Sequence, residues 1–343
     1  MKHLKLPFST PRRLPFYLAT EEWCARFLPP DDYFFSWRVM PTVICGRNQD
    51  MTREVDMDYC RKNGIDVVRR KSGGGCVYAD LDNFMFSYIC PGDEITATFA
   101  RYTTMIAGVL QAMGVDARAN GRNDIVVNNR KIAGNAFYHL PGRCIAHGTM
   151  LYNFDPSVMQ RAITPSRAKL ESKAVRSVPM RVTCARAEGI TLSHNEFENR
   201  FISSICDGEV LVCPDDIYEI EKIEQTYYRP VFLYRKGAHE ADATSMPVLT
   251  AKKRIEGVGE VEIRLTKTYD RKINSIGLTG DFFLIGDMHE YICKPLEGTP
   301  LQVPEIKKAV EAANPGAAIA GLSRENLLEL LIQITEESQK ENI

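Results

Sequence analysis

Residues 69–78 read Arg69-Arg70-Lys71-Ser72-Gly73-Gly74-Gly75-Cys76-Val77-Tyr78, a basic segment that runs into three successive glycines. Glycine has no Cβ, so this run lets the main chain approach a ligand closely and adopt dihedrals that other residues avoid. The flanking arginines supply fixed positive charge and forked donors for a carboxylate or a phosphate. The segment therefore predicts an anion-binding loop, with a plain turn as the alternative reading of the glycines alone.

A second charged block follows about fifty residues later. It consists of Gly121-Arg122-Asn123-Asp124 and, beyond a turn, Lys131-Ile132-Ala133-Gly134. Taken singly, Lys131 would be read as a solvated surface lysine. Its place across one hairpin from Asp124, on a strand of small residues, instead predicts a cation that holds the same phosphate from the opposite side. Together the two blocks indicate a site for an acyl-adenylate.

Composition limits the class of protein. The chain has 343 residues, 44% hydrophobic and 25% charged, with a formal net charge of −1. These values are typical of a soluble globular protein and give no long-range attraction to nucleic acid. Ten cysteines are scattered without a Cys-x-x-Cys pair, and no apolar run suits a signal core or a membrane span. We expect a cytoplasmic protein that binds neither nucleic acid nor membrane.

The first half of the chain predicts alternating helices and strands. Residues 17–28 show helical spacing, and a second helix is expected over 56–63, ending at Gly64. Strands are expected at 33–37, 42–45, 65–69 and 84–90. The turn at Met40-Pro41 suggests that the first two of these strands are antiparallel neighbours.

The next segments place the charged block on a hairpin. A helix over 96–113 is followed by short strands at 115–119 and 124–127, then by the turn residues Asn128-Asn129. Lys131 is expected just inside the returning strand, and residues 144–154 add another. Residues 157–207 read as helical and irregular, with a basic segment containing Lys169, Lys173, Arg176 and Arg181.

Length favours two domains, because single hydrophobic cores rarely grow beyond about 250–300 residues. We expect domains at 1–246 and 250–343, joined by a hinge at 246–250. In the second, strands are predicted at 260–268 and 272–277 around a short hairpin, and a last helix begins after the N-cap Ser323.

Other candidate residues receive a structural interpretation. His147 lies in a β-rich run and is assigned to the wall of the ligand site. Cys76 and Cys144 were weighed as nucleophiles, but no His-Asp pattern accompanies them, and cysteine in an apolar strand is usually a small hydrophobe. The sequence has no zinc-ligand spacing, Walker loop or Gly-x-Ser-x-Gly elbow.

The chain resembles the lipoate-protein ligase A family over nearly its whole length. The blocks that carry the resemblance, in order, are Tyr17-Leu18-Ala19-Thr20-Glu21-Glu22-Trp23, Pro41-Thr42-Val43-Ile44-Cys45-Gly46-Arg47-Asn48-Gln49, the loop at 69–75, Asn83-Phe84-Met85-Phe86-Ser87, Gly121-Arg122-Asn123-Asp124, Lys131-Ile132-Ala133-Gly134-Asn135-Ala136 and His147-Gly148-Thr149-Met150-Leu151. Gly280-Asp281-Phe282-Phe283 is similar to the signature of the family's second domain.

The resemblance implies an α+β fold: a catalytic domain of mixed and antiparallel sheets with flanking helices, shared with biotin protein ligases, and a small α/β accessory domain. It implies that lipoate and ATP form lipoyl-AMP, and that the lipoyl group moves to a lysine of an apo lipoyl domain of a 2-oxoacid dehydrogenase E2 subunit or of the glycine-cleavage H protein. Lys131 matches the family's essential lysine, and Asp124 either helps to place Mg²⁺ or orients Lys131. A monomer is expected.

The resemblance also assigns binding residues. Arg70, Ser72 and the glycines Gly73, Gly74 and Gly75 would line the acyl and carboxylate tunnel, Tyr78 and Asn83 would face the nucleotide, and Trp37 and Val77 would form an apolar slot. The chain departs from the family pattern at Ala79 and Asp82, where a histidine and a glycine are usual, and at Thr226-Tyr227-Tyr228-Arg229-Pro230 before the accessory domain.

Three alternatives stay open at this point. One is a transferase of the same fold that takes octanoyl or lipoyl from a carrier through a cysteine thioester, although Arg122-Asn123-Asp124 fills the block near which such a cysteine usually lies. Another is a lipoyltransferase that uses preformed lipoyl-AMP with the same Lys131. The last is a non-catalytic module that binds lipoyl domains, which the charged pair and glycine loop disfavour.

Overall fold

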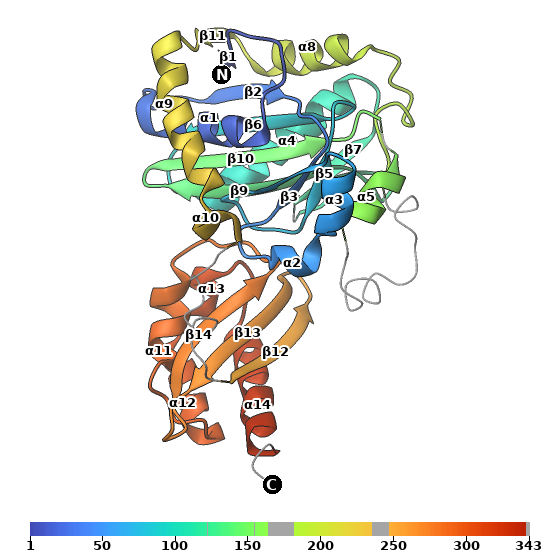
Figure 1. The fold of residues 1–343 in the computed structure, drawn as a ribbon. Helices are drawn as coiled ribbons and strands as arrows, with labels where there is room; N and C mark the ends of the chain where they lie inside the picture. The colour runs from blue at the N-terminus through green and yellow to red at the C-terminus, as the bar shows by residue number, and fades with distance from the viewer. Residues whose placement is uncertain (122, 154, 164–181, 235–246, 341–343) are drawn as a thin grey trace.

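The computed structural model describes residues 1–121, 123–153, 155–163, 182–234 and 247–340. Within them the chain forms two lobes stacked along one long axis, with the N-terminus in the larger lobe and the C-terminus at the far end of the smaller one (Figure 1). The basic segment with Lys169, Lys173, Arg176 and Arg181 lies outside the described residues, as do Arg122 and Phe154. No helix of the described chain is both long and apolar enough to cross a membrane.

The larger lobe is built on an eight-stranded mixed sheet. Its strands, in spatial order, are β11 (Gly208–Leu211), β1 (Lys2–Lys5), β2 (Tyr33–Trp37), β6 (Phe84–Pro91), β10 (Arg143–Met150), β9 (Arg130–Leu140), β8 (Asp124–Val127) and β7 (Ala117–Ala119). Successive residues of a strand face opposite sides, so Phe34 enters one hydrophobic core and Phe35 the other.

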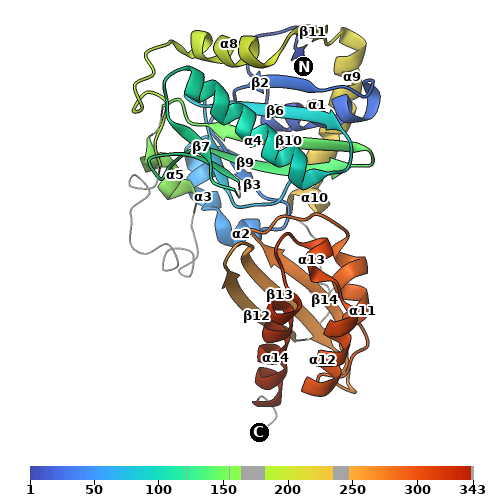
Figure 2. The same cartoon turned by 180° about the vertical axis from the view of Figure 1, so that it is seen from behind.

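Helices cover both faces of this sheet (Figure 2). α4 (Ile95–Ala112) and α8 (His194–Ile205) pack on one face, and α1 (Leu14–Phe27) and α9 (Pro214–Glu224) on the other. α1 starts with Pro15 in its first turn, where proline's missing N–H costs no helical hydrogen bond. The short elements α5 (Pro156–Ala162), η1 (Gln225–Tyr228) and α10 (Pro230–Tyr234) complete the lobe.

A small second sheet carries the glycine loop. β3 (Thr42–Cys45) lies at its centre, parallel to β4 (Asp66–Arg69) and antiparallel to β5 (Val77–Ala79). α2 (Met51–Glu54) and α3 (Met57–Lys62) connect β3 to β4. The loop that joins β4 to β5 contains the three glycines.

The predicted pairing of residues 33–37 with 42–45 is wrong. β2 pairs with β1 and β6 in the large sheet, whereas β3 belongs to the small one. All four residues of β3 are buried, as expected for a central strand with a neighbour on each side. Two apolar runs joined by a short turn carry the same local pattern whether they form a hairpin or enter different sheets, so only the packing decides.

The hairpin predicted around Asn128-Asn129 is confirmed. Both asparagines have positive φ angles, 49° and 59°, and the turn returns β8 into β9 with Lys131 near the start of β9. Asparagine tolerates this left-handed conformation because its short polar side chain can hydrogen-bond locally. The turn therefore brings Lys131 back beside the strand that begins at Asp124.

The smaller lobe has an antiparallel sheet of β12 (Val248–Ile255), β13 (Gly259–Lys267) and β14 (Ile273–Gly280). Its helical segments are η3 (His289–Cys293), α11 (Lys294–Leu296), α12 (Val303–Ala312), α13 (Pro315–Ala318) and α14 (Arg324–Lys340). The expected strands at 260–268 and 272–277 and the last helix are present, and Ser323 Oγ accepts from the Asn326 amide at 3.2 Å. β12 was not predicted, because charged residues interrupt its apolar alternation; it begins inside the expected hinge.

The two lobes meet at the glycine loop. The Gly74 amide donates to the Phe282 carbonyl at 3.2 Å, and the Gly280 amide donates to the Asn48 carbonyl at 3.0 Å. Arg53 of α2 pairs with Glu262 of β13 at 3.0 Å. The smaller lobe therefore packs directly against the segment that the sequence marks as the ligand loop. The α+β fold predicted from the sequence, with mixed sheets, flanking helices and a small accessory domain, is confirmed.

Candidate active site

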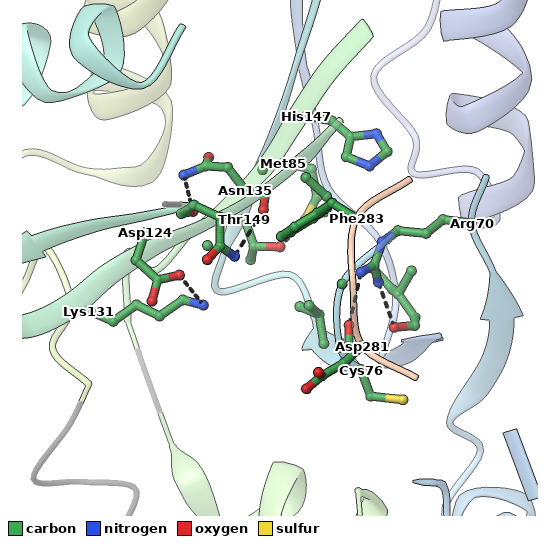
Figure 3. Close-up of a pocket in the computed structure, with 18 of the residues that line it drawn as sticks. Arg70, Cys76, Met85, Asp124, Lys131, Asn135, His147, Thr149, Asp281 and Phe283 are labelled. Carbon is green, nitrogen blue, oxygen red and sulfur yellow. Dashed lines mark hydrogen bonds and ion pairs between the residues drawn. The ribbon is translucent and has the colours of Figure 1, made fainter. Parts of the chain in front are cut away.

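A cavity of about 350 Å³ lies where the glycine loop, the large sheet and the smaller lobe meet (Figure 3). Both charged and apolar residues line it. The lining residues are Leu14, Leu18, Trp37, Ile44, Arg70, Gly74, Gly75, Cys76, Val77, Met85, Asn120, Asn123, Asp124, Lys131, Gly134, Asn135, Ala136, His147, Gly148, Thr149, Arg254, Asp281 and Phe283. The cavity can accommodate a ligand with an anionic head and an apolar tail.

Arg70 organises the glycine loop from within. Its guanidinium donates to the Ile44 carbonyl at 3.0 Å, to the Gly73 carbonyl at 2.6 Å and to the Gly75 carbonyl at 2.9 Å. Burial lowers the pKa of Arg70 to about 10, because the charged form loses its hydration. The side chain holds the loop in shape and leaves a positive charge at the cavity wall.

Glycine is required where the loop closes on its neighbours. Gly74 has φ of +87°, which disfavours any residue with a Cβ. Opposite it, a Cβ on Gly46 would overlap the Gly74 carbonyl. Arg69 is also buried, but it donates to the carbonyls of Gly46, Arg47, Gln49 and Leu233 and does not line the cavity. Of the two arginines, only Arg70 lines the cavity.

Lys131 and Asp124 form an ion pair on the opposite wall, with Nζ 2.7 Å from Oδ1. Both side chains are partly exposed to the cavity. The pair stands on the β8–β9 hairpin, where the register shifts between Ile125 and Val126. A Cβ on Gly134 would overlap the end of the Lys131 side chain. The glycine therefore provides the space in which the ammonium lies.

A buried hydrogen-bond chain supports the wall behind the glycine loop. Arg70 Nε donates to Ser72 Oγ at 2.9 Å, and Ser72 lies 2.7 Å from His147 Nε2. His147 Nδ1 lies 2.9 Å from Glu21 Oε1. Ser72 Oγ accepts from the guanidinium and contacts one ring nitrogen of His147, while the other ring nitrogen contacts Glu21. The chain therefore fixes the orientation of the His147 ring.

The same carboxylate also supports the apolar wall. Ser87 Oγ donates to Glu21 at 2.6 Å, and Trp37 Nε1 donates to Ser87 Oγ at 2.9 Å. Trp37 stacks on Tyr17 with ring centroids 4.7 Å apart. Glu21 therefore supports both His147 and, through Ser87, Trp37. Trp37 and Val77, which the sequence assigned to an apolar slot for the acyl chain, line the cavity.

The predicted site residues are only partly brought together. Arg70, Gly74, Gly75, Asp124, Lys131 and His147 line the cavity, whereas Ser72 and Gly73 belong to the loop but do not line the cavity. Tyr78 packs in the core of the small sheet, and burial and Asp80 raise its pKa. The side-chain amide of Asn83 donates to the Asp80 carboxylate at 2.8 Å. Neither Tyr78 nor Asn83, for which the sequence predicts nucleotide contacts, lines the cavity.

The smaller lobe also contributes to the cavity, which was not predicted from the sequence. Arg254, Asp281 and Phe283 line the cavity, and Phe283 stacks on Phe137 with centroids 5.2 Å apart. The block 280–283 was recognised only as the mark of a second domain. Asp281 and Phe283 follow the end of β14, and a charged and an aromatic residue in that place were the sequence signal for a role in the site.

The donor set for a cation is small. Among the described residues, no group of three or more His, Cys, Asp or Glu is arranged to hold a metal ion. Mg²⁺ commonly binds through one or two carboxylates and substrate phosphates. Asp124 and Asp281 supply two carboxylates to the cavity lining, which fits that requirement but not a metal cage built from protein alone.

The mixed sheet with flanking helices, the appended three-stranded lobe and the loop-and-lysine cavity define a lipoyl protein ligase type of enzyme. The model of the lipoyl protein ligase A/B catalytic domain matches residues 14–206, and that of the bacterial lipoate protein ligase C-terminus matches residues 248–331. The chain therefore belongs to the lipoate-protein ligase family and is an enzyme of the ligase class.

Proteins named as lipoate-protein ligases are similar to this chain. The chain is 31% identical to lipoate-protein ligase LplJ of Bacillus subtilis over 318 residues, 92% of this chain and 95% of the relative. A bipartite lipoate protein ligase from Thermoplasma acidophilum, solved in a study with its E2 lipoyl domain, is 26% identical with a TM-score of 0.61, covering 68% of this chain and 96% of that one.

Two other solved structures are similar. A lipoate-protein ligase A bound with ATP is 25% identical with a TM-score of 0.59, covering 67% of this chain and 97% of that chain. LipL1 of P. falciparum, in complex with lipoate, covers 98% of this chain and 99% of its own with a TM-score of 0.73; at 17% identity this likeness concerns the fold, both lobes included.

Proposed function

We propose that this protein is an ATP-dependent ligase that activates free lipoate as lipoyl-AMP and transfers the lipoyl group to a lysine of an acceptor protein. The observation that carries the proposal is the placement of the Lys131–Asp124 pair and the Arg70-supported glycine loop on opposite walls of one cavity. Two positive charges facing one space suit a carboxylate that reacts with a phosphate.

In the first half-reaction a carboxylate oxygen of lipoate attacks the α-phosphorus of ATP, and the bond to pyrophosphate breaks. Negative charges approach one another as the acyl-phosphate bond forms. Lys131, on the cavity wall, would donate to both the carboxylate and the α-phosphate and offset their repulsion. Arg70 adds positive charge from the glycine loop.

In the second half-reaction an uncharged acceptor lysine attacks the acyl carbonyl, the amide bond forms, and the acyl–oxygen bond to AMP breaks. The amine loses its proton, and AMP carries the negative charge away. Lys131 is positioned to stabilise that leaving phosphate, so one ammonium would serve both steps.

The apolar wall supports an acyl chain as the substrate tail. Leu18, Trp37 and Met85 are apolar residues of the cavity lining. Burial of each CH₂ group there would contribute about 0.8 kcal/mol. The names of the relatives support lipoate as that chain, and the similar ligase solved with ATP supports the nucleotide.

Mg²⁺ is proposed as the cation that accompanies ATP. The Asp124 carboxylate would hold it together with phosphate oxygens, and the bound ion would neutralise phosphate charge. The Asp124 contact with Lys131 means that the same carboxylate also orients the ammonium. Either contact favours phosphate binding at this wall.

The proposed acceptors are apo lipoyl domains of 2-oxoacid dehydrogenase E2 subunits and the glycine-cleavage H protein. The pairing of the Thermoplasma ligase with its E2 lipoyl domain supports the first. We further propose a cytoplasmic monomer with domains at 1–246 and 250–343, since the smaller lobe has a hydrophobic core of its own.

Intact mass of an apo lipoyl domain tests this function. The domain is incubated with the protein, Mg²⁺, ATP and free lipoate, with an ATP-omitted control. An ATP-dependent lipoyl mass increase is the expected result. A shift that appears only with supplied lipoyl-AMP or an octanoyl carrier would make the protein a transferase of the same fold and overturn the ligase assignment.

A further inference from the structure

Two cysteines from different strands meet beside the cavity. Cys45 ends β3, and Cys76 follows Gly75 directly before β5; their sulfur atoms are 3.4 Å apart. The antiparallel register of β3 and β5 pairs Ile44 with Val77, so the next pair along the ladder is Cys45 and Cys76. Residues opposite one another in such a ladder have Cα atoms about 4.5–5.5 Å apart, within the range that a disulfide spans.

The two thiols differ in access. Cys45 is fully buried, whereas Cys76 is partly exposed and lines the cavity. Figure 3 shows Cys76 among the residues that line the cavity. A small oxidant that enters the cavity would therefore meet Cys76 first, with Cys45 directly behind it as a second thiol.

The surroundings favour ionisation of Cys45. The contact with Cys76 and the nearby guanidiniums of Arg69 and Arg70 lower the pKa of Cys45, although burial opposes the effect. Thiolates, not thiols, react with oxidants. Elsewhere burial raises the cysteine pKa: to about 11 for Cys144 and Cys206, to about 12 for Cys293, and upward for Cys24 and Cys60.

We propose that Cys45 and Cys76 form an oxidisable dithiol that closes to a disulfide when a hydroperoxide enters the cavity. In the first step Cys76 gives its proton to the ionised Cys45 across their contact and attacks the peroxide oxygen as a thiolate; the O–O bond breaks, and a sulfenic acid and hydroxide form. In the second, that hydroxide takes the proton back from Cys45, the Cys45 sulfur attacks the sulfenic sulfur, and hydroxide leaves. Overall two thiols and one hydrogen peroxide give one disulfide and two water molecules.

The disulfide would alter the wall that holds the ligand. An S–S bond is about 2.05 Å long, so closure draws Cys76 away from the cavity and toward β3. Cys76 adjoins Gly75, whose carbonyl accepts from Arg70 at 2.9 Å. Movement of Cys76 would therefore displace the glycine loop and the Arg70 guanidinium together. This consequence rests on the proposed ligase function: oxidation lowers ligation at least fivefold, and reduction restores it.

The test treats the full-length protein with hydrogen peroxide, blocks remaining thiols with iodoacetamide and maps peptides by mass spectrometry without reductant. Ligation is then measured after desalting, before and after dithiothreitol. Cys45→Ala removes the second thiol while Cys76 stays at the cavity. Cys60→Ala is the matched control, because Cys60 is buried in the same hydrophobic cluster as Cys45.

The expected result is a peptide pair joined through residues 45 and 76 and lighter by two hydrogens in the wild type and in Cys60→Ala, but not in Cys45→Ala. Each protein's ligation is compared with its own untreated rate, and only Cys45→Ala should lose the reversible inhibition. Peroxide that modifies the exposed Cys213 without joining residues 45 and 76 overturns the proposal. A disulfide that leaves ligation unchanged overturns the regulatory part.

The mass readout needs no ligase activity. A protein that forms the disulfide but ligates nothing even when reduced would refute the proposed function and leave the dithiol in place.

Discussion

The main-chain amide of Gly74 donates a hydrogen bond to the carbonyl of Phe282, at 3.2 Å, and this contact joins the glycine loop to the smaller lobe. Gly73 packs so tightly on the same carbonyl that a Cβ there would overlap it. The wall that we assign to ligand binding is therefore shared between the two lobes. Any step that separates the lobes also opens the cavity.

Lys131→Ala is expected to lower adenylation about 100- to 1,000-fold, because it removes a cation aimed at the reacting phosphate. The free energy of unfolding should change by less than about 1 kcal/mol, since a partly exposed ion pair contributes little. Lipoate-dependent exchange of pyrophosphate into ATP measures the first effect and urea unfolding the second. Unchanged exchange in a folded variant would contradict the assigned role.

Gly134→Ala is expected to lower adenylation about tenfold or more, because the new methyl group takes the space of the Lys131 side-chain end. The flexible lysine can move aside, so folding should be little affected. Gly108→Ala in α4 serves as the control, since its Cβ would meet nothing within 4 Å. Equal activity of both variants would show that the position of the ammonium does not matter.

Gly73→Ala is expected to loosen the contact between the lobes, because its Cβ overlaps the Phe282 carbonyl and main-chain atoms cannot move aside cheaply. Hydrogen exchange should become faster at the amides of Gly74 and Gly280, which both bond across the interface. Gly208→Ala, where a Cβ meets only an ordinary contact at 3.8 Å, is the control. Protection equal to that of the wild type would argue against the shared wall.

Glu21→Gln is expected to destabilise the protein by about 1–3 kcal/mol, because the carboxylate accepts from His147 and Ser87 in a buried site. The amide nitrogen of glutamine would face one of these donors and leave a proton without an acceptor. The midpoint of urea unfolding measures the loss, and Trp37 fluorescence reports on the apolar wall. An unfolding midpoint equal to that of the wild type would mean that the buried chain adds no stability.

Local patterns predicted much of the first lobe. Helical spacing located α1 and α4, and the Asn128-Asn129 turn returned Lys131 to the strand that begins at Asp124, because a tight hairpin brings its two strands together. The pairing of β2 with β3 was predicted wrongly, since a four-residue connection does not record whether the chain changes sheet. β12 was missed because Lys252, Lys253 and Arg254 obscure its alternation.

The sequence by itself determined the α+β class through its resemblance to a known family. Short-range spacing and residue chemistry determined the glycine loop with its arginines and the hairpin lysine. Only the tertiary structure decided that Arg70 faces the cavity while Arg69 does not, and that Asp281 and Phe283 complete the wall. It also decided that Cys45 meets Cys76 and that Glu21 reaches His147. Such contacts join residues distant in the chain, and the packing of whole elements against one another sets their geometry.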